Sequence, residues 1–197
     1  LVCDELKYNE KTGAGYATKH ALLKDYSQGK DTLYAHADSI KIFTFNINTD
    51  SVYRKVHCYN KVSIFRADVQ AISDSLVFNS QDSCLTMYKD PVVWSDGRQL
   101  LGEVIKVYMN DSTVRFAQVV GQALSVEQMP DKQHYNQVAS RLMNAYFDQG
   151  NIRQTEAIGN VRTVYYYTDD KDSSLVALNY METDTLRMYL SDKRQLE

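Results

Sequence analysis

The chain has 197 residues, with 22 Lys and Arg against 25 Asp and Glu, which gives a formal net charge of -3. Hydrophobic residues make up 44% and charged residues 24% of the chain, a balance that argues against wholesale disorder. The near-neutral charge and the lack of a long basic run exclude the usual electrostatic footprint of a nucleic-acid-binding protein. The chain is also rich in tyrosine, with 15 Tyr beside 8 Gly and 2 Pro.

The first third of the chain shows the alternation of apolar and polar residues that predicts β-strands. A degenerate first unit covers residues 1–32, with strand segments at 5–8 and 17–23. Ile40 and Ile42 then share one face of a predicted strand. Tyr, Val, Ile, Thr and Phe fit a pleated surface, so the tyrosine excess is itself a strand signal.

The alternation continues through the rest of the chain. Val62 and Ile64 share a face, and Leu85 and Met87 do the same. The segment from Gln133 to Phe147 has a few apolar pairs at helical spacing but is also compatible with a strand. We therefore predict an all-β fold that forms one continuous domain over residues 1–197.

Turn signals built from Asn, Asp, Ser and Gly separate these strands. They lie at residues 9–13, 46–50, 79–82, 96–97, 110–112, 148–151 and 168–172. Strands separated by such turns are typical of a sandwich, a barrel or a stacked β-repeat.

A repeat of about 29 to 38 residues runs through the chain. Its first element is a short strand such as Ala37-Asp-Ser-Ile40, which recurs as Ser73-Asp-Ser-Leu76, Gly102-Glu-Val-Ile105, Ala139-Ser-Arg-Leu142 and, more loosely, Ala177-Leu-Asn-Tyr180. Its last element is a short punctuated strand, found as Asn60-Lys-Val62, Asp90-Pro-Val92, Gly121-Gln-Ala123 and Gly159-Asn-Val161. The ordered recurrence predicts a repeat architecture of hairpin-plus-strand units.

These motifs resemble those of OstA-like proteins, a family that includes periplasmic lipopolysaccharide-transport components of Gram-negative bacteria. The residues that carry the resemblance most clearly are Tyr8-Asn-Glu-Lys-Thr-Gly13, Ala37-Asp-Ser-Ile40, Tyr59-Asn-Lys-Val62 and Gly159-Asn-Val161. The resemblance spans essentially the whole chain. Asp90-Pro-Val92 and Gly121-Gln-Ala123 depart from the family's Gly-Asn-Val pattern.

The resemblance implies an open β-jellyroll, in which two facing antiparallel sheets form a V-shaped trough that never closes. The trough would hold the acyl chains of lipopolysaccharide or a related glycolipid, and each CH₂ removed from water is worth about 0.8 kcal/mol. Open edge strands would pair with like domains or with other transport components. The resemblance also implies a role in outer-membrane biogenesis and a periplasmic location, with association with the outer membrane as an option.

The alternation pattern, projected onto this trough, selects the residues expected to line it. Those expected to touch the ligand are Ile40, Ile42, Val62, Ile64, Leu76, Phe78, Met87, Trp94, Ile105, Val107 and Phe116. Val52, Val56, Leu85, Val92 and Val114 complete the set expected to point inward. For each residue the alternative is simple core packing against the facing sheet.

The sequence contains no recognisable catalytic motif. It has no Walker lysine motif, H-E-x-x-H or G-x-S-x-G, its four His are dispersed, and its three Cys have no C-x-x-C spacing. We therefore expect no enzymatic activity, catalytic residue, metal or cofactor. No apolar run is long enough for a membrane-spanning helix, and the first residues do not read as a signal peptide.

Two rival hypotheses remain beside lipid transport. One is a structural or interaction β-repeat that carries no lipid. The other is a carbohydrate-active β-sandwich, which requires clustered carboxylates and exposed aromatic residues on a concave face. The fold alone does not decide between them.

Overall fold

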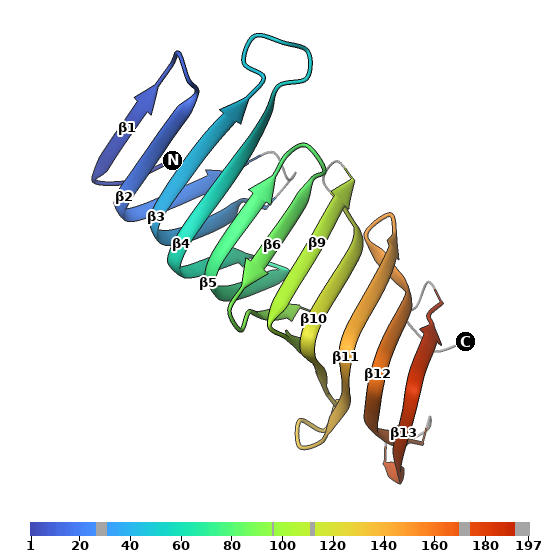
Figure 1. Ribbon diagram of the computed structural model, residues 1–197. Coiled ribbons are helices and arrows are strands. Elements are labelled where there is room, and N and C mark those ends of the chain that lie inside the picture. The colour runs from blue at the N-terminus through green and yellow to red at the C-terminus, as the bar shows by residue number, and fades with distance from the viewer. Residues whose placement is uncertain (27–30, 96, 111–112, 170–173, 192–197) are drawn as a thin grey trace.

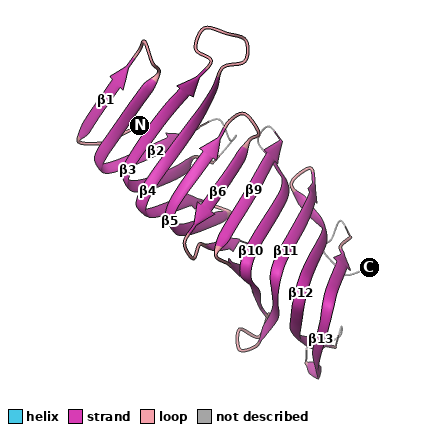
Figure 2. Ribbon diagram, viewed as in Figure 1, coloured by secondary structure: helices cyan, strands magenta, loops and turns pink. Residues whose placement is uncertain are grey.

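The computed structural model describes residues 1–26, 31–95, 97–110, 113–169 and 174–191, and its regular elements are all β-strands (Figure 2). The strands are β1 (Glu5–Asn9), β2 (Ala14–Asp25), β3 (Leu33–Phe45), β4 (Tyr53–Arg66), β5 (Val69–Asn79), β6 (Cys84–Tyr88), β7 (Val92–Ser95), β8 (Arg98–Leu101), β9 (Val104–Asn110), β10 (Thr113–Gln128), β11 (Tyr135–Asp148), β12 (Asn151–Thr168) and β13 (Leu175–Tyr189). The all-β prediction is confirmed, and the ambiguous segment after Gln133 is strand β11.

All thirteen strands belong to one antiparallel sheet, and most strands pair with their neighbours in the sequence. Figure 1 shows β1 to β6 and β9 to β13 side by side from the N-terminal to the C-terminal end of an elongated molecule. The predicted turns at residues 9–13, 46–50, 79–82 and 148–151 connect successive strands. Residues 96, 111, 112 and 170–172 of the other three predicted turns lie outside the described residues.

The sheet is bent along one line that crosses the long strands. Register shifts recur on this line, for example between Tyr59 and Val62 and between Ile158 and Val161. In Figure 1 the strands of the N-terminal half turn at the lower edge and run back behind the visible face. We call the half of the sheet that carries β6 and β9 the front layer, and the half that carries β7 and β8 the rear layer.

Pairs of consecutive residues with positive φ produce this bend. They are Lys19 with His20, Asn60 with Lys61, Lys89 with Asp90, Gly121 with Gln122, and Gly159 with Asn160. Left-handed backbone turns a strand sharply, and Gly and Asn adopt it at the lowest cost. The short punctuated element of the repeat, such as Gly159-Asn-Val161, is therefore a bend signal, and the residue after each left-handed pair is buried.

The two middle strands of the sheet break completely at the bend. Pro91 separates β6 from β7 and cannot donate a ladder hydrogen bond. Gly102 separates β8 from β9, and a Cβ placed on it would lie 2.4 Å from Val119 Cγ1. As a result β5 and β10 each pair with a front and a rear strand, and six strands close into a barrel in the order β5, β6, β9, β10, β8, β7.

This closed barrel differs from the expectation of a sheet that closes nowhere. The end strands β1 and β13, in contrast, each have a single strand partner among the described residues.

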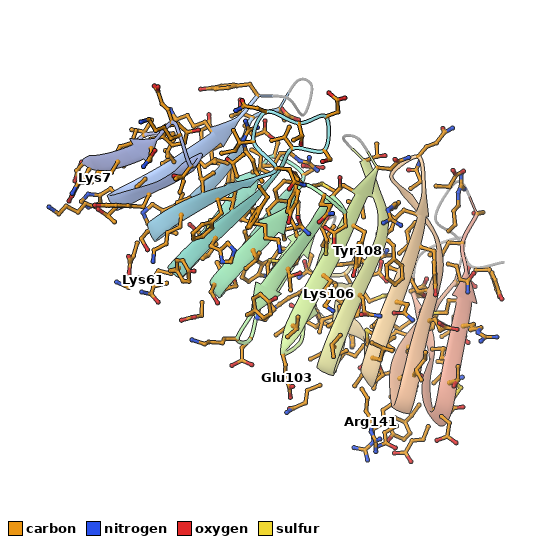
Figure 3. All side chains as sticks on the ribbon, turned by 45° about the horizontal axis from the view of Figure 1, so that its top comes forward. Lys7, Lys61, Glu103, Lys106, Tyr108 and Arg141 are labelled. Atoms are coloured by element: carbon orange, nitrogen blue, oxygen red, sulfur yellow. The ribbon has the colours of Figure 1, made fainter. Side chains whose placement is uncertain are left out.

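Figure 3 shows Lys61, Glu103 and Arg141 along one edge, where polar side chains cover the outside of the bend. Within the described ranges, no helix long and apolar enough to cross a membrane occurs.

Candidate functional site

An apolar row crosses the inner side of the front layer next to the bend. Its members stand directly opposite one another on neighbouring strands, because the register of every pair places them in line: Ala17, Ile40, Cys58, Leu76, Met87, Ile105, Val119, Met143, Ala157 and Leu186. We call this the first interior row. At about 4.8 Å between strands, ten members extend over roughly 43 Å.

The rear layer presents a matching inner side with smaller side chains. Next to the bend lie Ala21, Ala37, Val62, Ser73, Pro91, Ala123, Ser140 and Val161, all of them buried. One hydrophobic cluster contains residues of both layers, such as Ile105 in front and Ile64 behind. The two inner sides therefore pack against each other and form a common interior.

Burial in this interior falls with distance from the bend. Ile40 and Ile105, in the first interior row, are 0% and 1% exposed. One step farther out lies a second interior row of partly exposed apolar side chains: Ile42, Val56, Phe78, Leu85 and Val107. The interior is thus sealed at the bend and more accessible toward its rim.

Most residues predicted to line the trough do lie in this interior. Nine of the eleven expected ligand contacts belong to the hydrophobic cluster or pack against it: Ile40, Ile42, Val62, Ile64, Leu76, Phe78, Met87, Ile105 and Val107. Val56 and Leu85 join them, and Val114 pairs with Met109 on the inner side. Val52 is exposed in the turn before β4 and does not line the interior.

The structure places Trp94 and Val92 on the outer side of the rear layer, against the prediction. The sequence repeat aligns Asp90-Pro-Val92 with Asn60-Lys-Val62, but the left-handed pair is Lys89 and Asp90, one residue earlier. Pro91 therefore takes the buried position, and Val93 points inward instead. A shift of one residue moves every following side chain to the opposite face.

Phe116 also lies on the outer side, for a different reason. The register shifts between Val114 and Phe116, so Arg115 is an extra residue in β10. The bulge reverses the alternation, and Phe116 packs between Tyr108 and Tyr146, with ring centroids 5.7 and 5.1 Å away. In Figure 3 Tyr108 and Lys106 lie on this outer face of β9.

The sequence analysis missed several interior residues. Ala17, Cys58, Val119, Met143 and Val161 are buried but were not assigned to the inner side. For Val161 the signal was available, because it directly follows the left-handed pair Gly159 and Asn160. Ala17 was not singled out by the alternation, because Gly15 and Lys19, two positions away on either side, are not apolar side chains.

The interior rows offer little for acid–base chemistry. Cys58 carries the one ionisable side chain of the first interior row, and burial raises the pKa of its thiol to about 11. A thiol with so high a pKa stays protonated and unreactive at neutral pH. These rows are therefore suited to holding apolar groups.

Polar and charged residues occupy the inner rim of the rear layer. Arg98 donates from Nε and Nη2 to Glu127 Oε1, over 3.0 and 2.7 Å. Arg66 pairs with Asp68 through two hydrogen bonds, which lower the pKa of that carboxyl group. The apolar interior thus ends in a charged border.

A polar ladder strengthens the outer side of the front layer. Gln118 donates to Asn144, and Asn144 donates to Glu156, over 3.1 and 3.2 Å. Arg187 completes the ladder from β13 with a hydrogen bond of 2.7 Å to Glu156, whose pKa it lowers.

Within the described residues no cluster of three or more His, Cys, Asp or Glu is arranged to hold a metal ion.

Asp131 organises the loop between β10 and β11. Its Oδ1 accepts from the backbone N–H groups of Gln133 and His134, over 2.9 and 3.1 Å, and its Oδ2 lies 2.6 Å from His134 Nδ1. These bonds, led by the one from Gln133, lower the pKa of Asp131 to about 2. The carboxylate therefore stabilises this loop only while it is ionised.

Stability should fall at acid pH through this residue. A depressed carboxyl pKa contributes stability above the unfolded value of 3.8, and that contribution is lost as the pH falls toward about 2. We expect the urea midpoint to drop more in the wild type than in Asp131→Asn between about pH 5 and pH 2. Equal drops in the two proteins would show that the hydrogen bonds of the ionised carboxylate do not stabilise the fold.

No protein-family model matches the chain, and no curated protein does.

Proposed function

We propose that the protein is a non-enzymatic lipid-binding module of outer-membrane biogenesis, located in the periplasm. It holds the acyl chains of lipopolysaccharide or a related glycolipid between its two layers, as in an open β-jellyroll. It joins like domains or other transport components through its edge strands.

The observation that carries the proposal is the continuous apolar interior. The first interior row crosses ten strands without a charged residue, and the second row, with Phe78 and Val107, is partly exposed. Acyl chains need a long apolar surface and no directional chemistry, and each buried CH₂ contributes about 0.8 kcal/mol. The graded burial gives such chains a way in from the rim.

The ends of the sheet support the assembly part of the proposal. β13 has 15 residues, nearly all of them at least partly exposed, and β12 is its strand partner. An exposed strand edge carries unpaired N–H and C=O groups that a further strand can complete. Leu178 and Tyr180, each 59% exposed, add apolar surface beside this edge.

A structural scaffold without lipid is the second candidate. The observation that favours it is the nearly complete burial of both layers next to the bend. Ile40 and Ile105 in the front layer and Val62 in the rear layer are at most 2% exposed. Side chains packed at the density of a protein core leave no room for a ligand there. In this case the second interior row is only the margin of a filled core.

Site-specific crosslinking separates the two candidates. A photoreactive amino acid replaces Phe78 or Val107 in the second interior row, and the purified protein is incubated with lipopolysaccharide and irradiated. We expect crosslinks to lipopolysaccharide at both positions, because both side chains face the interior where acyl chains would lie. The measurement is the shift of the protein band that an antibody against lipid A recognises.

Phe116 provides the matched control, because it is a phenylalanine on the outer side of the same layer. It should give little product under the same conditions. Equal crosslinking at residues 78, 107 and 116, or none at residues 78 and 107, contradicts the lipid proposal and favours the scaffold.

A further inference from the structure

A notch at the rim of the rear layer reaches from its outer side to the charged border formed by Asp68 and Arg98. It has a volume of about 430 Å³ and lies at the hairpin of β7 and β8. Its wall includes Trp94, Gln70, Gln99, Gln128 and Tyr135. Small-molecule sites in proteins have volumes of roughly 300 to 1,000 Å³, so the notch is large enough for one or two sugar rings.

Trp94 stands at the centre of this wall. It lies directly opposite Gln70 on one side and Gln99 on the other. Trp94 is 37% exposed, and Tyr135, the first residue of β11, is 40% exposed. Exposed aromatic rings flanked by amides combine a flat apolar platform with hydrogen-bonding groups at its edges.

The flanking amides are available to a ligand. The side chains of Gln70 and Gln99 make no hydrogen bond to any residue that the structure describes. Gln128 Nε2, in contrast, already donates to the Lys132 carbonyl over 3.4 Å and to Tyr135 Oη over 3.3 Å. Each amide offers two donors and an acceptor on adjacent atoms. This arrangement matches neighbouring hydroxyl groups of a sugar ring.

The charges around the notch favour a neutral ligand. Asp68 is bound by Arg66 and Glu127 by Arg98, so both acids and both bases are already paired. No cation of these two pairs is left over to recognise a phosphate. The backbone also offers nothing to an extended peptide, because β7 and β8 each have strand partners on both sides.

We infer that this notch is a carbohydrate-binding site that takes an uncharged pyranose disaccharide. One ring stacks its C–H face on Trp94, and its hydroxyl groups bond to the amides of Gln70 and Gln99. Trp94, Gln70 and Gln99 face away from the proposed acyl-chain interior, because they lie on the outer side of the rear layer.

The single tryptophan of the chain provides a direct readout. Maltose, cellobiose and di-N-acetylchitobiose are titrated separately into the purified protein while the intrinsic tryptophan fluorescence is recorded. We expect a saturable change in intensity or wavelength with at least one of them at millimolar concentrations. Gln70→Ala and Gln99→Ala should each weaken that binding about fivefold, since each removes a hydrogen bond.

Trp94→Ala removes both the platform and the reporter, so its binding is measured by calorimetry and should be lost. Tyr88→Ala and Gln137→Ala are the matched controls, since Tyr88 is 38% exposed on the front layer and Gln137 is exposed outside the notch. Both should bind as the wild type does, and circular dichroism checks that every variant is folded. The assignment is overturned if none of the three sugars changes the tryptophan fluorescence. It is also overturned if Trp94→Ala, or the double variant Gln70→Ala, Gln99→Ala, binds a sugar as tightly as the wild type does.

Discussion

Replacing Ile105 by alanine is expected to lower the free energy of unfolding by about 3 to 4 kcal/mol. Ile105 lies in β9, is 1% exposed, and stands directly between Met87 and Val119. Its loss removes three buried carbons and leaves a cavity. The neighbouring strands cannot collapse into that cavity, because the ladders of β6 and β10 hold them in register. Urea unfolding followed by far-ultraviolet circular dichroism measures the change.

Ile72→Ala is the matched control for this prediction. Ile72 is 47% exposed on the outer side of β5, so the same truncation should cost no more than about 0.5 kcal/mol. Similar losses for the two variants would show that the interior rows do not form the core that holds the layers together. A loss confined to Ile105→Ala would identify the interior as the main source of stability.

The alternation of apolar residues was sufficient to predict most of the interior. Ile40 with Ile42 and Val62 with Ile64 are correctly placed because each pair lies on an uninterrupted stretch of strand. Within such a stretch the side-chain period is 2, and one buried residue determines the face of its neighbours. The prediction of these residues did not require knowledge of the bend.

The errors come from places where the alternation is interrupted. Trp94 was misplaced because the left-handed pair before β7 lies one residue earlier than the repeat suggests. Phe116 was misplaced because a bulge at Arg115 reverses the faces. Both interruptions depend on contacts with neighbouring strands, and a single strand's pattern does not contain them.

The closed barrel also depends on information beyond local pattern. A proline within a strand pattern usually indicates an edge or a bulge, yet Pro91 lies between β6 and β7 in the centre of the sheet. Gly102 has the same effect between β8 and β9, because its neighbour Val119 fills the space of a side chain. The ring closes because β5 pairs with both β6 and β7, β10 pairs with both β9 and β8, and the pairs β6–β9 and β7–β8 complete it. This pairing is a property of the whole sheet.

Replacing Gly159 by valine should test the bend itself and is expected to cost about 2 to 3 kcal/mol. Gly159 has φ = 80°, a conformation that a β-branched residue adopts only with strain. A Cβ at this position would also lie 3.1 Å from Arg141 Cδ and 3.3 Å from Arg141 Cβ, so the Arg141 side chain would have to shift by a few tenths of an ångström. The free energy of unfolding in urea measures the effect.

Gly150→Val separates the backbone strain from the crowding. Gly150 has the same φ of 80° in the turn between β11 and β12, but its nearest contact would be Thr113 Cβ at an ordinary 3.7 Å. We expect this variant to lose about 1 to 2 kcal/mol, the conformational part alone. The difference between the two variants then measures how tightly the layers are held at the bend. If Gly159→Val lost no more stability than Gly150→Val, the bend would tolerate added volume, and the Gly159-Asn-Val161 element would serve only as a turn.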